Sequence, residues 1–232
     1  MKVCPMKKLF NIVFWFLLRI RYRISVKGFA AVKKRSRQEA DRPILFLPNH
    51  QALIDPLITM NLLAHSFAPR PLADEEQVAQ PLIRYLMKLV NAVLIPDLKT
   101  GGKGVREQIF IGLEEVVAGL KEGDNILLYP SGRLCRGRLE VIGANSGAAS
   151  IAQAVPEARI VLLRIRGLWG SQFSRASGSP SLLKNIKQLI LSVLVNGLLF
   201  MPRRRVDIEL VEPDDFPRSS DKKEINKYLE SF

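Results

Sequence analysis

The stretch ILFLPNHQALIDPLITMNLL, residues 44–63, decides how this chain folds. It begins with the apolar run ILFLP, a pattern typical of a strand that is buried on both faces of a parallel sheet. Asp55 and Pro56 then mark a helix start, because aspartate is a favoured N-cap and proline a favoured first helical residue. His50 is therefore expected in the turn after the carboxyl end of the strand, where ligand sites form in open α/β sheets.

His50 and Asp55 are separated by four residues. On a continuous helix this spacing would place the two side chains about 140° apart. If the intervening residues fold back as a tight loop, the Asp55 carboxylate reaches the imidazole and fixes its tautomer, and the other ring nitrogen becomes a general base. The alternative is a loop histidine beside an ordinary helix start, and this stretch alone leaves both open.

Along the rest of the chain, apolar runs that predict strands alternate with segments of helical periodicity. Strands are expected at residues 44–47, 125–130, 159–167 and 206–213, with a short one at 23–28. Helices are expected at residues 6–24, 56–64, 105–123, 144–155 and 221–232, while 81–95 is expected to be a helix running into a strand and 33–43 a polar connection. This alternation predicts an α/β domain whose mostly parallel sheet is covered by helices.

The 232 residues carry a formal net charge of +13, which favours an anionic partner. Basic residues flank two apolar segments, at the N-terminus and before residues 203–205, and this arrangement favours an anionic membrane surface over nucleic acid. Residues 1–24 are predicted to form an interfacial membrane helix, too short to span a bilayer, before a domain at 25–232. The alternative is a buried N-terminal helix. The apolar segment 182–201 is a second interfacial helix, half of a re-entrant hairpin, or an ordinary core helix.

A second candidate site follows the strand at 125–130, in the sequence NILLYPSGRLCRGRLE. Gly132 allows backbone to approach a ligand closely, and the guanidinium groups of Arg133 and Arg136 suit phosphate oxygens. Arg138 is expected to be surface charge. Two strand ends, one with His and Asp and one with Gly and Arg, predict an acid–base centre beside an anion pocket.

NHQALID resembles the His-x4-Asp signature of the PlsC-like glycerophospholipid acyltransferase superfamily, and YPSGR resembles its Phe-Pro-Glu-Gly-Thr/Arg signature. With RGLWGSQFSR and VDIELVEP, the chain is most similar to the acyltransferase domain of 2-acylglycerophosphoethanolamine acyltransferases. The resemblance implies that His50 is the base and Asp55 orients it. It places the acceptor's phosphate near Ser131, Gly132 and Arg133, although Ser131 stands where the family usually has glutamate. Lys99 or Lys103 is expected to replace an arginine of the family's middle loop.

The resemblance implies transfer of a fatty acyl group from acyl carrier protein or coenzyme A to a hydroxyl of a lysophospholipid or acylglycerol phosphate. Neither a metal nor a redox cofactor is implied, and no nucleic-acid partner is expected. The expected location is the cytoplasmic face of the cell membrane. The alternative is a lipid-surface binding protein that keeps the fold without the chemistry. A serine hydrolase is disfavoured because the sequence has no G-x-S-x-G elbow.

Overall fold

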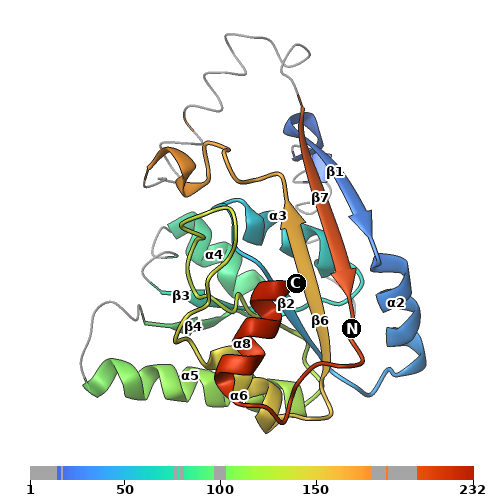
Figure 1. The fold of residues 1–232 in the computed structure, drawn as a ribbon, viewed down its shortest axis with the longest axis vertical. Coiled ribbons are helices and arrows are strands. Elements are labelled where there is room, and N and C mark those ends of the chain that lie inside the picture. Colours follow the sequence, from blue (N-terminus) through green and yellow to red (C-terminus); the bar gives the residue numbers. More distant parts are fainter. Residues whose placement is uncertain are drawn as a thin grey trace.

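The structure, a computed structural model, describes residues 15–16, 18–75, 78, 81–96, 103–178, 187 and 203–232. Its centre is a seven-stranded sheet with the order β1-β7-β6-β2-β5-β3-β4 (Figure 1). Five neighbouring strands run parallel: β6 (Arg159–Arg166), β2 (Ile44–Pro48), β5 (Ile126–Leu127), β3 (Arg70–Asp74) and β4 (Val93–Ile95). At one edge β7 (Arg204–Val211) is antiparallel to β6 and parallel to β1 (Tyr22–Lys27).

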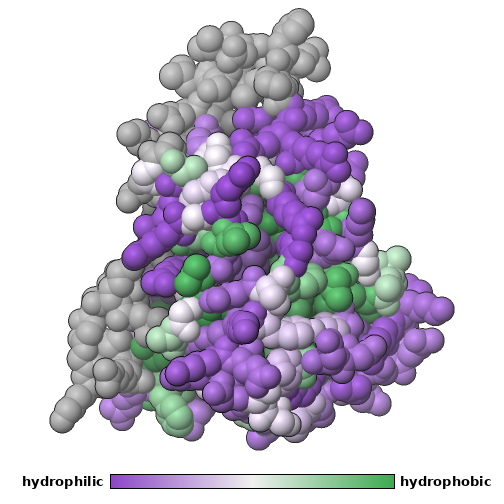
Figure 2. Space-filling model, viewed as in Figure 1, coloured by the Kyte–Doolittle hydropathy of each residue, from purple (hydrophilic) through white to green (hydrophobic). Residues whose placement is uncertain are grey.

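Helices cover both faces of this sheet. The face packed by α2 (Phe29–Gln38) and α3 (Asp55–Ala64) has one apolar core, and the face packed by α5 (Lys103–Lys121), α6 (Gly147–Ala154) and α8 (Lys222–Ser231) has a second. The helix α4 (Pro81–Leu89) connects β3 to β4, and a 3₁₀ turn lies at Arg175–Ser177. Figure 2 shows the face that carries α8, where hydrophobic side chains gather in a band between hydrophilic ones.

The strand β2 is buried along its whole length, as the run ILFLP predicts. Phe46 packs into the core on the α3 side, and Leu45 and Leu47 pack into the core on the α5 side. Side chains that alternate between two apolar cores explain why the strand is apolar at every position. The predicted mixed α/β architecture is confirmed, with five of the seven strands mutually parallel.

Two predicted boundaries and one predicted loop are wrong. Residues 33–38 of the expected polar connection belong to α2, which begins after Gly28. Val32 is the one buried residue of this helix, so no apolar stripe marks it in the sequence. Strand β1 starts at Tyr22, so the N-terminal helix ends before residue 24. Strand β5 is limited to Ile126–Leu127. Strand β3 was not expected, because it is short and contains Pro71, a residue uncommon inside sheets.

Several sequence predictions lie outside the described residues. They are Lys99, residues 1–14 and 17 of the predicted membrane helix, and all of 182–201 except residue 187. Within the described part of the chain, no helix combines the length and apolar character that crossing a bilayer needs. The side chains of Trp15 and Phe16 are exposed, at 47% and 62%, and the Arg19 guanidinium lies 4.0 Å from the centre of the Trp15 ring.

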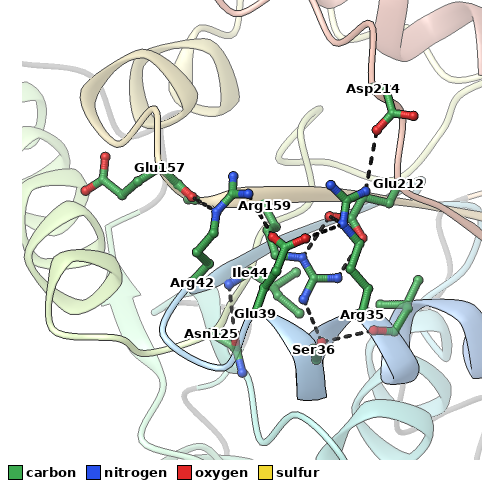
Figure 3. Close-up of polar contacts among 12 residues, drawn as sticks. Arg35, Ser36, Glu39, Arg42, Ile44, Asn125, Glu157, Arg159, Glu212 and Asp214 are labelled. Carbon is green, nitrogen blue, oxygen red and sulfur yellow. Dashed lines mark hydrogen bonds and ion pairs between the residues drawn. The ribbon is translucent and has the colours of Figure 1, made fainter.

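A buried ion pair joins the strands at the edge of the sheet where β2 and β6 begin (Figure 3). The Arg159 guanidinium, 1% exposed, donates to both carboxylate oxygens of Glu212, at 2.8 and 2.6 Å, and to Ser36 Oγ at 2.8 Å. Beside it, the amide of Ile44 donates to Asn125 Oδ1 at 2.8 Å. The contacts of Arg159 tie α2 and β6 to the segment after β7, and the contact of Ile44 ties β2 to the residue before β5. All lie at the end of the sheet opposite His50.

Candidate active site

The His50 turn leaves the carboxyl end of β2 and is fixed to its neighbours by hydrogen bonds. Asn49 Nδ2 donates to the Ile165 carbonyl at 3.0 Å, and Asn49 Oδ1 accepts from the Ile165 amide at 2.7 Å. The amide of Leu53 donates to the Phe173 carbonyl at 2.9 Å. The turn is therefore held on both sides of His50 by backbone from β6 and from the segment that follows it.

Within this turn the chain folds back, and the predicted contact between His50 and Asp55 is present. His50 Nδ1 lies 3.3 Å from Asp55 Oδ2, and the same oxygen accepts from the Ala52 amide at 2.8 Å. The sequence predicts Asp55 to be the N-cap of α3, and this prediction is wrong. Ile54 holds that position, and Asp55 is the first helical residue, with its carboxylate directed back at the turn. With Nδ1–H donating to Asp55, Nε2 keeps the lone pair that a general base needs.

The Asp55 carboxyl group is completely buried. Burial raises its pKa above the usual value, and the hydrogen bond and charge of His50 act in the opposite direction. In such a low-dielectric setting, a carboxylate attracts a positive charge much more strongly than it would in water. Asp55 is therefore placed to stabilise the imidazolium that forms when His50 accepts a proton.

Tyr129, at the end of the strand region that begins with β5, forms the wall behind His50. The two ring centroids are 4.4 Å apart and the rings are inclined by 38°. The Tyr129 hydroxyl lies 3.2 Å from Thr59 Oγ1, which itself donates to the Asp55 carbonyl at 2.8 Å, so the phenol is the donor. Burial raises the pKa of Tyr129 well above its usual value, so the phenol stays neutral and holds the imidazole by packing.

The loop after Tyr129 carries the second group of predicted residues and lies against the His50 turn. Ser131 is buried, and its hydroxyl lies 2.5 Å from Glu140 Oε1 and 2.9 Å from the Arg133 carbonyl. Gly132 is exposed and has φ +60°, a left-handed conformation that favours glycine. The Cys135 amide donates to the His50 carbonyl at 2.7 Å. Loop and turn thus form one hydrogen-bonded unit.

The predicted arginines divide between the loop surface and a cavity. Arg133 and Arg136 are exposed, and neither lines the cavity. The cavity, of about 450 Å³, lies on the α8 side of the ends of β2 and β6, on the face shown in Figure 2. Its walls include Arg138, Arg164, Arg166, Pro130, Trp169 and Phe232. Arg138, expected to be surface charge alone, is exposed yet contributes to this wall.

Sequence reasoning missed three residues of this site, which are Tyr129, Cys135 and Glu140. Tyr129 had a signal, because it occupies the aromatic position of the YPSGR signature. Glu140 also had one, since it is the only acidic residue between residues 129 and 146. Cys135 had none, because its amide, not its side chain, makes the contact with His50. In the described residues, no group of three or more His, Cys, Asp or Glu side chains is arranged to hold a metal ion.

Comparison with known proteins gives a family and a fold. The family model described as Acyltransferase matches residues 27–165, more than half of the chain. The structure resembles the crystal structure of the 1-acyl-sn-glycerophosphate (LPA) acyltransferase PlsC from Thermotoga maritima, with a TM-score of 0.61 and 18% identity. The match covers 97% of this chain and 75% of that one. No curated protein is significantly similar in sequence.

Proposed function

Because the chain belongs to the acyltransferase family, we propose that it transfers a fatty acyl group from an acyl thioester to a hydroxyl of a lysophospholipid or acylglycerol phosphate. The single observation that carries this proposal is the contact between His50 and the buried Asp55 at the carboxyl end of β2. A base oriented in this way activates a hydroxyl directly. The resemblance to 2-acylglycerophosphoethanolamine acyltransferases supports a lysophospholipid acceptor.

In the proposed reaction, His50 Nε2 takes the proton of the acceptor hydroxyl as its oxygen attacks the thioester carbonyl. The tetrahedral intermediate then collapses, the carbon–sulfur bond breaks, and the departing thiolate takes the proton back from the imidazolium. Asp55 holds the Nδ1 proton throughout and offsets the transient positive charge. Atoms and charge balance without a cofactor, and acyl carrier protein or coenzyme A leaves as the thiol.

We assign the acceptor's phosphate to the loop of Ser131 and Gly132, with Arg133 and Arg136 as its cationic partners. Both arginines are exposed, and the guanidinium fork suits phosphate oxygens. Lys99 stays a prediction as a further cationic contact. Arg164 and Arg166, in the nearby cavity, add to the positive field that draws an anionic substrate to this edge of the sheet.

A covalent acyl-enzyme on Cys135 is disfavoured, although this cysteine lies in the loop beside His50. Burial, with the nearby charges of Glu140 and Asp55, raises the pKa of its thiol to about 12. Only the thiolate is an effective nucleophile, so the group is inactive at neutral pH. We expect Cys135→Ala to leave kcat close to that of the wild type in a steady-state assay. A loss of turnover with an unchanged melting temperature would show that the thiol takes part.

We propose that the protein works at the cytoplasmic face of the cell membrane, bound to anionic lipid. Exposed Trp15 and Phe16 beside Arg19, together with the net charge of +13, support this. We expect the double variant Trp15→Ala/Phe16→Ala to bind vesicles of anionic phospholipid roughly tenfold more weakly in a sedimentation assay. The exposed aromatic Tyr85 provides a matched control, Tyr85→Ala. Equal vesicle binding by both variants and the wild type would contradict this role.

The test of the proposed function is an acyl-transfer panel with the purified full chain in detergent micelles. Two donors are used, acyl carrier protein and coenzyme A, each carrying a radiolabelled acyl group as a thioester. Each donor is offered with lysophosphatidylethanolamine, lysophosphatidylglycerol, lysophosphatidate and glycerol 3-phosphate. Monoacylglycerol, which has a hydroxyl but no phosphate, is the control acceptor. We expect turnover with a phosphate-bearing acceptor and much less with monoacylglycerol. Micelle binding without turnover on any pair would instead support the non-catalytic lipid-surface protein.

A further inference from the structure

Glu140 occupies an unusual place for the only acidic residue of a loop that contains Arg133, Arg136 and Arg138. None of these three described arginines forms an ion pair with it. Its carboxylate turns inward instead. Oε1 accepts from the Ser131 hydroxyl at 2.5 Å and from the His50 amide at 3.2 Å.

These two contacts connect the two halves of the site through one oxygen atom. Ser131 belongs to the loop after β5, and His50 to the turn after β2. Hydrogen bonds to a carboxylate are about twice as strong as bonds between neutral groups, so this is a strong link. A second link, from the Cys135 amide to the His50 carbonyl at 2.7 Å, holds the other backbone polar group of the same residue. The loop thus forms hydrogen bonds with both the backbone amide and the backbone carbonyl of His50.

Burial raises the pKa of Glu140, while the Ser131 hydroxyl, the nearby His50 and its amide act to lower it. Burying a carboxyl group is costly unless its oxygens find donors. A surface glutamate in an arginine-rich loop would avoid this cost by pairing with a guanidinium in water. The inward position therefore points to a function that needs a carboxylate beside His50.

We propose that Glu140 is a positioning residue of the acyltransferase site, which fixes the loop of Ser131 and Gly132 against the His50 turn and supplies this loop with an internal carboxylate. The proposal rests on the proposed function. It also explains why serine is tolerated at position 131, where the resembled signature has glutamate. In this chain the carboxylate arrives from nine positions later and is held by the serine hydroxyl.

The test compares four variants with the wild type: Glu140→Gln, Glu140→Ala, Ser131→Glu, and the exchange Ser131→Glu/Glu140→Ser. Glu140→Gln keeps the shape and removes the charge. We expect it to lower kcat roughly ten- to hundredfold, the range for a lost hydrogen bond to a charged group, with little change in KM. Ser131→Glu is expected to lose activity as well, because two carboxylates then share one buried site. The exchange variant returns one carboxylate to the site and is expected to recover most of the lost kcat.

A purely structural role would predict a different pattern. The exchange disturbs packing at two positions, so its kcat would then be lower than that of either single variant. Melting temperatures identify variants that fail to fold, and Glu122→Gln, at an exposed position in the turn after α5, is the matched control. Wild-type kcat in Glu140→Gln would overturn the proposal, as would an exchange variant no better than Glu140→Gln.

A second measurement needs no turnover, so a failure of the proposed function cannot be mistaken for a failure of this proposal. Hydrogen exchange is followed at the His50 amide, which donates to Glu140. We expect faster exchange at this amide in Glu140→Ala and wild-type exchange in Glu122→Gln. Unchanged exchange in Glu140→Ala would show that the carboxylate does not hold the turn.

Discussion

Replacing His50 by alanine is expected to lower kcat for acyl transfer by roughly 10²–10⁴-fold, the contribution usual for a general base. The physical reason is the loss of the only proton acceptor that Asp55 orients in the turn after β2. KM is expected to change little, because the imidazole acts on the reacting hydroxyl and the phosphate is bound elsewhere. The measurement is steady-state transfer of label from the thioester to the acceptor pair that the wild type uses best.

The chain contains a matched control for this variant, because it has only two histidines. His65 is exposed at the end of α3, and His65→Ala is expected to keep the wild-type rate. Melting curves show whether both variants fold. If folded His50→Ala transfers acyl groups as fast as His65→Ala, His50 is not the base.

Replacing Glu212 by alanine is expected to lower the free energy of unfolding by about 3–5 kcal/mol, the cost of breaking a buried ion pair. Arg159 is 1% exposed and would keep a positive charge without its bidentate partner. The position lies at the opposite edge of the sheet from His50, so the folded fraction should keep a normal kcat. Urea denaturation measures the change in the free energy of unfolding.

Asp214 provides the matched control for this prediction. Asp214 lies 3.5 Å from Arg35, an arginine that also lies 3.6 Å from Glu212 (Figure 3), but the Asp214 side chain is 92% exposed. Asp214→Ala is therefore expected to leave stability unchanged, because exposed ion pairs contribute little. The double change Arg159→Met/Glu212→Leu removes both charges and is expected to be more stable than Glu212→Ala. Equal stability of Glu212→Ala and Asp214→Ala would contradict this account of the pair.

The fold follows from sequence where burial determines residue type. The run ILFLP is apolar because β2 packs against two cores, and Arg159–Arg166 repeats this pattern in β6. Sequence patterns do not predict an element that buries few side chains. Helix α2 has one buried residue, Val32, and its second half carries Lys33, Lys34, Arg35 and Arg37, so it lacks the periodicity that predicts a helix.

The candidate site was predictable in part. His50 and Asp55 are close in sequence, and the strand and helix on either side constrain the turn between them. Glu140 was not predictable as a partner of His50, because the contact depends on how a loop ninety residues away folds back. Side chains that meet through tertiary packing leave no periodic signal in one sequence. The same limit explains why Arg138 was expected to be surface charge, although it lines the cavity beside β6.

The central claim, direct transfer from a thioester to a lipid hydroxyl with His50 as the base, is tested most directly by following the label of an acyl thioester. The protein is mixed with labelled thioester in the presence and in the absence of lysophospholipid, and the lipid, free fatty acid and protein fractions are counted. The account predicts that label moves into phospholipid only when acceptor is present, and that none stays bound to protein. Label retained on the protein, or released as fatty acid at the same rate with and without acceptor, would contradict it.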